Sequence, residues 1–430
     1  MRESLFFASG VDITVLLSCS WFLCRYGKIS IYHPAITYLV FHTFVFSTRI
    51  LFLTTGANFF LGNQIDYFTA IEAQEIIKAS LLADLGFISM TVAWLWEANR
   101  KTSFIPAKSV ILLDGNVLKL VLSITIPLGI WGIYSQLYIP GIGKSQFNFG
   151  SWSESSYIQN TQNWLILSCL VIVFKYGFQK YSLIIIGLCL FILAFQGQHR
   201  YRVLSPCLFL LFLYLHRENK KWISSRFVIL ILMGILIFLP MKYVGKLIQQ
   251  DASMEDLIEF ALEYRESLAL GVNADFSFLD MYASTLTLID QHGGYYYGST
   301  YFTLLFSPIP RQFWENKPSL IQWMTDISTP VRNLKELGSV ATLYGESYAN
   351  FGIFGILFIP FLFAKYSARW YYKILHTNAQ SANLFLYLCF ASMIIQVYRD
   401  GLNAIFIFLC IYNMPSFFVY FFSILKQKRA

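Results

Sequence analysis

The sequence predicts an all-α protein, a polytopic bundle of about eleven transmembrane helices with one large helical loop. Hydrophobic residues make up 56% of the 430 residues, and charged residues make up only 13%. Soluble domains carry about 25% charged residues, so a chain this apolar cannot cover itself with polar surface. The apolar residues also fall in long runs, and a helix needs about 20 such residues to cross a bilayer.

The apolar runs give the expected spans in chain order. The first has no small-residue cleavage site after it, so we expect a first span rather than a cleaved signal. The runs lie at 11–23, 35–53, 79–96, 117–137, 164–178, 183–195, 203–215, 227–243, 351–365, 384–398 and 402–425. They divide the chain into N-terminal transmembrane helices (1–243), a large loop (244–350) and C-terminal transmembrane helices (351–430).

The distribution of charge predicts the side of the membrane on which each connection lies. Short loops rich in Lys and Arg stay in the cytoplasm. The segment 245–340, in contrast, has twelve acidic and six basic residues. We therefore expect a cytoplasmic C-terminus and a large loop on the opposite side. The basic residues of the alternate short connections are Arg25, Lys28, Arg100, Lys101, Lys108, Lys180, Arg217, Lys220, Lys221, Arg226, Lys365, Arg369, Lys373, Lys426, Lys428 and Arg429.

The large loop is the soluble-like region with room for a site. Polar and apolar residues alternate at helical spacing over 254–270 and 275–291, which predicts two amphipathic helices. After a run of tyrosines, Pro308, Pro310 and Pro318 exclude a continuous helix. Broken backbone near a membrane is tolerated where it is buried in protein or lines a polar cavity, and sites are often built there.

Four arginines stand at the outer ends of predicted spans or in the loop, where positive charge is rare. They are Arg200, Arg202, Arg311 and Arg399. A guanidinium keeps its charge and binds phosphate oxygens through two hydrogen bonds, so the set predicts a diphosphate site. The alternative is that each arginine reaches lipid headgroups or pairs locally, as Arg399 would with Asp400.

Three further charged residues lie in or beside the predicted spans. Glu346 stands among small residues that favour close helix packing, and packing explains those residues but not the glutamate. Arg49 and Asp84 lie deeper, on consecutive antiparallel spans. An unpaired arginine at the bilayer centre costs about 2.5–3.5 kcal/mol, so we expect these two to form a structural ion pair in preference to binding a ligand.

Several classes of site are not supported. His199 and His292 lack metal-ligand spacing with another His or Cys, so no metal is expected. The seven cysteines all fall within apolar runs, which gives no sign of a disulfide or of a cysteine metal site. There is no Walker A run, Rossmann fingerprint or serine nucleophile elbow, so we expect no cofactor and no ATP- or NAD-linked chemistry. Nucleic-acid binding has no support either.

Four elements in the second half of the chain resemble one family when taken together and in order. They are Gly197-Gln-His-Arg200, Pro308-Ile-Pro-Arg-Gln-Phe-Trp-Glu-Asn-Lys-Pro318, the segment Gly338 to Gly352 with Gly345-Glu346, and Tyr398-Arg-Asp-Gly401. They are similar to elements of the O-antigen polymerase (Wzy) and oligosaccharide-repeat-unit polymerase family. The first half matches that family only as a hydrophobic pattern.

The resemblance implies a GT-C-like membrane glycosyltransferase in the bacterial inner membrane, with its large loop in the periplasm. Its donor and acceptor would be undecaprenyl-diphosphate-linked oligosaccharide repeat units held in the membrane lipid. They would be joined into O-antigen, capsule or exopolysaccharide at the periplasmic face. A polysaccharide chain-length regulator is a candidate partner. No metal is required, because preorganised arginines can stabilise the departing diphosphate.

We assign roles to individual residues on that basis. Arg200, Arg311 and Arg399 would hold the diphosphate, supported by Lys317 or Arg202. Glu346 is the first candidate for the general base, and His199 is the second. The residues expected to stack on sugars, with packing as the alternative for each, are Tyr296, Tyr297 and Trp314.

Three other functions remain open. An O-antigen ligase would share the architecture and the leaving group but would glycosylate the lipid A core; the Pro-Ile-Pro-Arg run favours a polymerase. A flippase or transporter would need charges through the membrane depth and an inverted repeat. The chemistry-bearing residues instead gather at one face. A scaffold without activity would leave the arginines unexplained.

Overall fold

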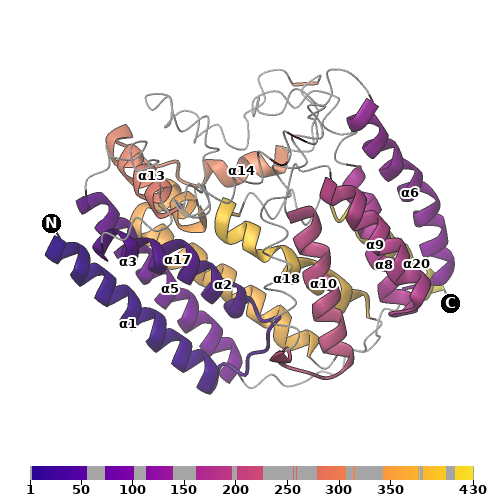
Figure 1. Ribbon diagram of the computed structural model, residues 1–430, viewed down its shortest axis with the longest axis horizontal. Coiled ribbons are helices and arrows are strands. Elements are labelled where there is room, and N and C mark those ends of the chain that lie inside the picture. The colour runs from indigo at the N-terminus through magenta and orange to yellow at the C-terminus, as the bar shows by residue number, and fades with distance from the viewer. Residues whose placement is uncertain are drawn as a thin grey trace. The chain divides into compact units, whose positions relative to one another are not determined.

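The computed structural model is all-helical over the residues that it describes (Figure 1). It has twelve helices there, with α2, η1 and α3 counted as one continuous helix, and no strand. The described residues are 2–55, 73–100, 113–138, 161–195, 201–225, 278–306, 342–375, 381–402 and 412–429, together with 255, 258, 313, 314 and 377.

Six of these helices are long and apolar enough to cross a membrane, which indicates a multi-pass membrane protein. They are α1 (Arg2–Tyr26), the continuous helix of α2 (Pro34–His42), η1 (Thr43–Ser47) and α3 (Thr48–Thr55), α5 (Ala73–Asn99), α6 (Gly115–Tyr138), α17 (Thr342–Ile374) and α18 (Ala382–Asp400).

Shorter helices stand at most of the other predicted spans. They are α8 (Gln162–Tyr176), α9 (Lys180–Phe195), α10 (Tyr201–Arg217) and α20 (Met414–Arg429). The predicted span 227–243 lies outside the described residues. The all-helical, multi-pass architecture is therefore confirmed, while the count of eleven spans and the sidedness stay predictions.

The chain forms two compact units, each assembled from segments that are distant in sequence. Unit 1 comprises Met1–Lys101, Glu259–Tyr371 and Ile394–Ile405, and unit 2 comprises Thr102–Ile258, Tyr372–Met393 and Phe406–Ala430. The predicted division at 243/244 and 350/351 stays a prediction.

Unit 1 is built around α5, which lies side by side with α1 (Figure 1). Helix α13 (Phe278–His292) packs on α5 and on η1, and α14 (Ser299–Phe306) follows it in the chain. The interior is rich in aromatic rings: the ring centroids of Tyr38 and Phe87 are 5.0 Å apart, and those of Tyr38 and Tyr398 are 4.9 Å apart.

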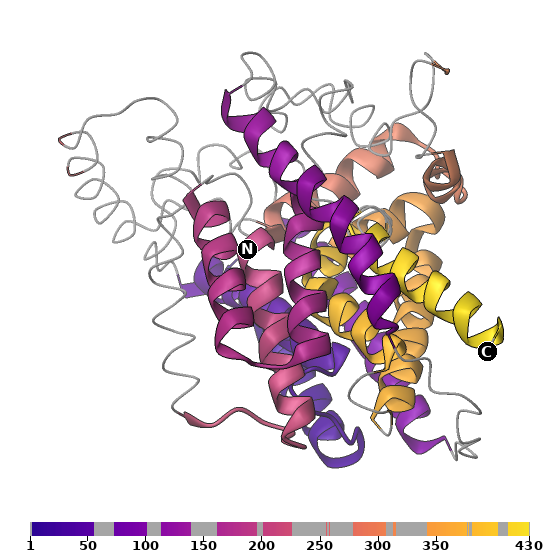
Figure 2. The ribbon, with the colours of Figure 1, turned by 90° about the vertical axis from the view of Figure 1, so that its right-hand side faces the viewer.

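Unit 2 is a second helical bundle, in which α8 contacts α6, α9, α10 and α20 (Figure 2). Its core holds Phe174 and Phe209, whose rings contact Phe385 at centroid distances of 5.1 and 5.2 Å. Thr125 and Ser168 share a hydrogen bond of 2.7 Å between α6 and α8. A hydroxyl pair of this kind joins helices without burying a charge.

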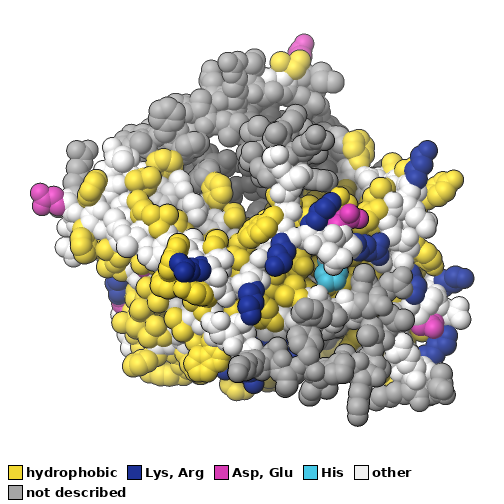
Figure 3. Space-filling view, turned by 90° about the horizontal axis from the view of Figure 1, so that it is seen from below, with side chains coloured by type: hydrophobic (Ala, Val, Ile, Leu, Met, Phe, Trp, Pro, Cys, Tyr) yellow, Lys and Arg dark blue, Asp and Glu magenta, His cyan; other side chains and the backbone are white. Residues whose placement is uncertain are grey.

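Large apolar side chains cover much of the described surface, as Figure 3 shows for one face. Phe6 is 72% exposed and Phe354 is 81% exposed. Such surface would be unfavourable in water, where a contiguous apolar patch marks a contact with lipid or with another protein. In a multi-pass membrane protein it is the surface expected to face lipid.

Helix α17 contains a break that shapes the region around it. Phe351 and Gly352 leave the helical conformation, and Gly352 has a φ of 61°. The Tyr295 hydroxyl lies where a side chain at position 352 would be, so only glycine fits there. The break lies six residues after Glu346.

Candidate functional site

The structure places six of the ten predicted site residues: Arg202, Tyr296, Tyr297, Trp314, Glu346 and Arg399. Predicted residues outside the described part of the chain are His199, Arg200, Arg311 and Lys317. Arg202 belongs to unit 2, and the other five belong to unit 1.

Glu346 is held against the turn that follows α18. Its Oε2 accepts a hydrogen bond of 2.5 Å from the backbone N–H of Leu402, and the residue is 1% exposed. Gly401 has a φ of 87°, and a Cβ added there would collide with the Glu346 carboxylate. The Gly345-Glu346 element and the Arg-Asp-Gly element, more than fifty residues apart, therefore meet in unit 1.

Arg399 is half-exposed at the end of α18. Its Nε lies 3.3 Å from Asp400 Oδ1, and its guanidinium lies over the Phe278 ring, 5.7 Å from the centroid. The local pairing with Asp400, which the sequence left open, is thus present. With its side chain 43% exposed, the guanidinium can still be reached by a ligand.

The tyrosine segment before α14 is bound to α17 next to its break. The backbone N–H groups of Tyr296 and Tyr297 donate to Ala349 O and Asn350 O, at 2.9 and 3.0 Å. Asn350 also donates from Nδ2 to Glu346 O, at 2.8 Å. The Tyr297 ring is 74% exposed and lies outside the core, although it meets the Tyr295 ring edge-on at a centroid distance of 6.3 Å.

The other two predicted aromatic residues make ring contacts. Tyr296 lies parallel to His292, with centroids 6.0 Å apart and an interplanar angle of 1°. Trp314 meets Phe306 edge-on at 5.5 Å and is 37% exposed. Packing, the alternative considered for these residues, thus has support at Trp314, whereas Tyr297 is the residue best placed to stack on a ligand.

In unit 2, Arg202 lines a small pocket at the start of α10. The residue is only 6% exposed, and its Nε and Nη1 have no hydrogen-bond partner in the described part of the chain. Among the described residues it forms no ion pair with a carboxylate. The rings of Tyr201 and Tyr412 stack beside it at an angle of 8°, and their hydroxyls are 3.0 Å apart. Asn163, Ser205, Met393 and Asn413 also line the pocket.

The prediction that Arg49 pairs with Asp84 is wrong. Arg49 lies instead against Asp280 of α13, with Nη2 at 2.6 Å and Nε at 2.8 Å from Oδ2. Both side chains are almost fully buried. Burial raises the pKa of Asp280, and the neighbouring guanidinium counteracts part of that rise. The partner comes from a helix 231 residues further along the chain, so span order alone could not identify it.

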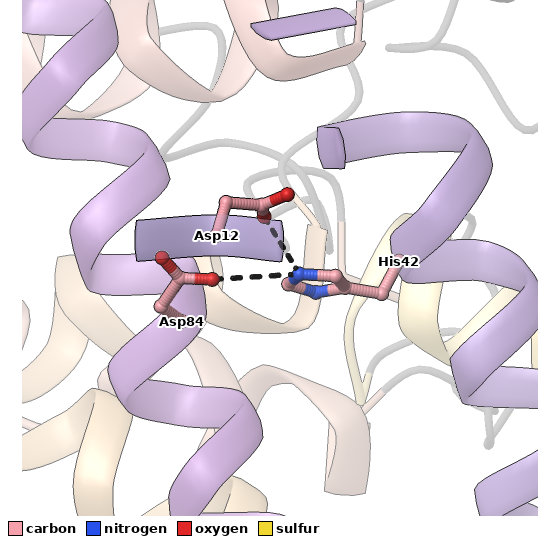
Figure 4. A group of neighbouring side chains, drawn as sticks. All are labelled: Asp12, His42 and Asp84. Atoms are coloured by element: carbon pink, nitrogen blue, oxygen red, sulfur yellow. Dashed lines mark hydrogen bonds and ion pairs between the residues drawn. The ribbon is translucent and has the colours of Figure 1, made fainter. Parts of the chain in front are cut away.

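Asp84 belongs to a buried cluster with Asp12 and His42, contributed by α5, α1 and α2 (Figure 4). His42 Nε2 lies 3.0 Å from Asp12 Oδ1 and 3.5 Å from Asp84 Oδ1. The three side chains are between 0% and 4% exposed. The available signal was an ionisable residue in each of the first three predicted spans, since such residues are rare and functional.

The surroundings of His42 hold the imidazole in one orientation. The Tyr38 hydroxyl lies 3.1 Å from His42 Nδ1, and it also forms a short hydrogen bond with the Tyr344 hydroxyl. The π-helical turn η1 begins directly after His42. Such turns are uncommon and frequently occur at functional sites.

No protein-family model, curated protein or solved structure matches this chain. Function must therefore be argued from the local chemistry. A buried guanidinium without a carboxylate can receive an anion. Two buried carboxylates with one imidazole can receive a cation. A hydrogen bond joins Glu346 to the turn that follows Arg399, so a buried carboxylate and a half-exposed guanidinium lie on connected elements of unit 1.

Proposed function

We propose that this protein is a membrane polymerase that joins lipid-diphosphate-linked oligosaccharide repeat units into a surface polysaccharide. The anomeric carbon of the growing chain would leave its diphosphate and bond to a hydroxyl of the incoming unit. A general base would take the hydroxyl proton, and the lipid diphosphate would depart as the anion. The motif order and the chemistry of the described residues support this proposal.

The Arg202 pocket is the observation that carries the proposal. No carboxylate of the described residues pairs with this arginine. Burying an unpaired charge is costly, and an anionic ligand would explain its position. The two tyrosines and two asparagines around it are residue types that bind sugars or phosphates through hydroxyl, amide and ring contacts. We therefore assign Arg202 to the diphosphate and its nearest sugar.

The pocket must widen to receive a phosphate group. Its cavity is about 20 Å³, which suffices for roughly one water molecule. Met393 lines it, and a methionine has three rotatable bonds and a polarisable thioether that adapts to a new neighbour. Substrate entry would displace this side chain, while the guanidinium stays in place.

The meeting of Glu346 with the Arg-Asp-Gly turn gives independent support. The resemblance predicted that both elements serve the reaction, and a hydrogen bond joins them. Glu346 remains our candidate for the general base, but it also positions the turn. Glu346→Gln keeps an acceptor for the Leu402 N–H and removes the base. We expect Glu346→Gln to lose polymerisation and keep its thermal stability.

The deciding experiment is a gene deletion in the native host, with surface polysaccharide resolved on gels. We expect a single repeat unit where a ladder stood, and wild-type protein should restore the ladder. Arg202→Ala should fail to restore it at normal protein level. Arg100→Ala, at an exposed arginine that pairs with Glu97 in unit 1, is the matched control and should restore it.

Two results would contradict the proposal. A normal ladder from Arg202→Ala would remove the observation on which it rests. Accumulation of long lipid-linked polymer in the deletion strain, with none on the lipid A core, would instead identify a ligase. If the protein is a ligase, the predicted roles of Arg311 and Lys317 would also have to be reassigned.

A further inference from the structure

We infer that Asp12, His42 and Asp84 form a binding site for one divalent transition-metal ion within the helices of unit 1. The site belongs to none of the motifs that suggested a polymerase, and it does not depend on that function. The sequence predicted no metal, because that expectation considered only cysteine placement and the spacing of His199 and His292.

The distances between the candidate ligand atoms fit a metal centre. One nitrogen and two carboxylate oxygens lie within 4.8 Å of one another. Nε2 is 3.0 Å from one oxygen and 3.5 Å from the other. Bonds of about 2.0–2.2 Å from a metal to nitrogen and oxygen place neighbouring ligands about 3–3.5 Å apart. Small side-chain movements would therefore close the shell.

Among the described residues, only one of the four carboxylate oxygens, Asp12 Oδ1, has a hydrogen-bond partner. Asp12 Oδ2 and both oxygens of Asp84 have no hydrogen-bond partner in the described part of the chain, although both side chains are at least nine-tenths buried. Asp84 Oδ1 points at His42 Nε2, as Figure 4 shows. An imidazolium could balance one negative charge, and the second would remain. A divalent cation bound by neutral imidazole would balance both.

The shell around the ligands is also that of a metal site. A metal-bound histidine usually has its second ring nitrogen held by a hydrogen bond, and Tyr38 does this at Nδ1. The rings of Phe46 and Phe87 lie 5.2 and 4.8 Å from the imidazole and exclude water. The π-helical turn after His42 shifts the register of the helix at this residue.

The donor set selects the class of metal. Imidazole favours zinc, iron, nickel or copper(II) over magnesium and calcium, and the two carboxylates disfavour copper(I), which prefers thiolate. The ion would join α1, α2 and α5. Through Tyr38 and Tyr344 it would also fix the start of α17, two residues before Glu346. We therefore assign it a structural role.

The test uses the full-length protein purified in detergent. Metal content is measured by plasma mass spectrometry, and the stripped protein is titrated with Co²⁺ and with Zn²⁺. We expect one Co²⁺ per chain, a visible d–d absorption band, and a Tm that rises by about 5 °C with Zn²⁺. Asp84→Asn and Asp12→Asn should weaken Co²⁺ binding at least tenfold.

His33→Asn is the matched control, because His33 is a buried histidine of the same unit outside the cluster. It should bind Co²⁺ as the wild type does. Asp84→Asn removes a buried charge, so it is expected to fold, and its unchanged helical circular dichroism would show this. A folded wild-type protein that binds neither ion, or a Tm that rises equally in Asp84→Asn, would overturn the proposal.

Discussion

The two units bury opposite charges, and neither charge is compensated within its unit by the residues that the structure describes. Unit 1 holds Asp12 and Asp84 around one imidazole, which leaves an excess of negative charge. Unit 2 holds Arg202 without a carboxylate partner, which leaves an excess of positive charge. Burying an uncompensated charge is costly, so each region is expected to be completed by a ligand of opposite sign.

The buried Arg49–Asp280 pair of unit 1 serves as the reference for these two uncompensated groups. Arg49 and Asp280 balance each other's charge, with two nitrogen–oxygen distances below 3 Å and almost no exposure, although Arg49 Nη1 and Asp280 Oδ1 have no hydrogen-bond partner among the described residues. Because the two charges cancel, no charged ligand is needed to account for their burial, and we assign the pair a structural role. The comparison teaches that burial of charge alone does not indicate function; burial without a partner does. Substitution should therefore have opposite effects at the paired and the unpaired sites.

The largest loss of stability is expected where the pair is broken. Arg49→Leu leaves Asp280 buried and alone, and should lower the free energy of unfolding by about 3–5 kcal/mol. The double variant Arg49→Leu/Asp280→Leu should recover most of that loss, because neither charge remains. Thermal unfolding in detergent measures both. A single variant as stable as the double would show that the pair is not coupled.

A loss of stability at acidic pH is expected from His33, a buried histidine of unit 1 outside the metal cluster. His33 begins α2, and its Nδ1 accepts the Ala35 N–H at 3.0 Å. Burial lowers the pKa of His33 from 6.5 to about 3. The unfolded chain therefore binds a proton before the folded one, and stability falls as pH drops from 6.5 towards 3.

By pH 5 this loss should reach about 2 kcal/mol. His33→Asn keeps an acceptor for the helix start and cannot titrate there, so its stability should change less between pH 7 and pH 5. Unfolding curves at both pH values, in wild type and variant, provide the check. An equal acid sensitivity in both proteins would assign the effect to other groups.

A smaller loss is expected at Gly401. Its φ of 87° is unfavourable for other residues, and an added Cβ would meet the Glu346 carboxylate. Gly401→Ala should cost about 1–3 kcal/mol. It should also displace the turn that carries Arg399. Gly10→Ala is the control, since nothing lies within 4 Å of a Cβ there.

The sequence predicted the helical class and most span positions, because long apolar runs report burial in lipid directly. It could not assign partners to buried charges, as Arg49 shows. Span order suggests Asp84 as the partner of Arg49, yet Arg49 pairs with Asp280, which comes from the predicted loop. Partner choice depends on tertiary packing of α13 against η1, which no local pattern encodes.

For the same reason, the sequence pointed to some of the candidate site residues and missed others. Motif resemblance brought Glu346 and the Arg399 turn to attention, and they do lie together. His42 drew no attention, since its partners are 30 and 42 residues away on separate helices. Metal-ligand spacing is recognised within one element, so a site built from three helices leaves only the weak signal of a charged residue in each apolar run.

The smallest change in stability is expected at the unpaired charges. This change bears most directly on the comparison between the two units. Arg202→Leu and Asp84→Asn each remove a buried charge without leaving a partner alone. Measured with a chelator and without lipid-linked substrate, both variants should be as stable as the wild type, or more stable by up to about 2 kcal/mol. That is opposite in sign to Arg49→Leu.

With ligand present the order should reverse. Zn²⁺ should then stabilise the wild type above Asp84→Asn, since only the wild type gains binding energy on folding. A lipid diphosphate should likewise stabilise the wild type above Arg202→Leu. If Arg202→Leu were instead destabilised by 3 kcal/mol or more without ligand, Arg202 would have a structural partner. The contrast between the two units would then reduce to the metal cluster alone.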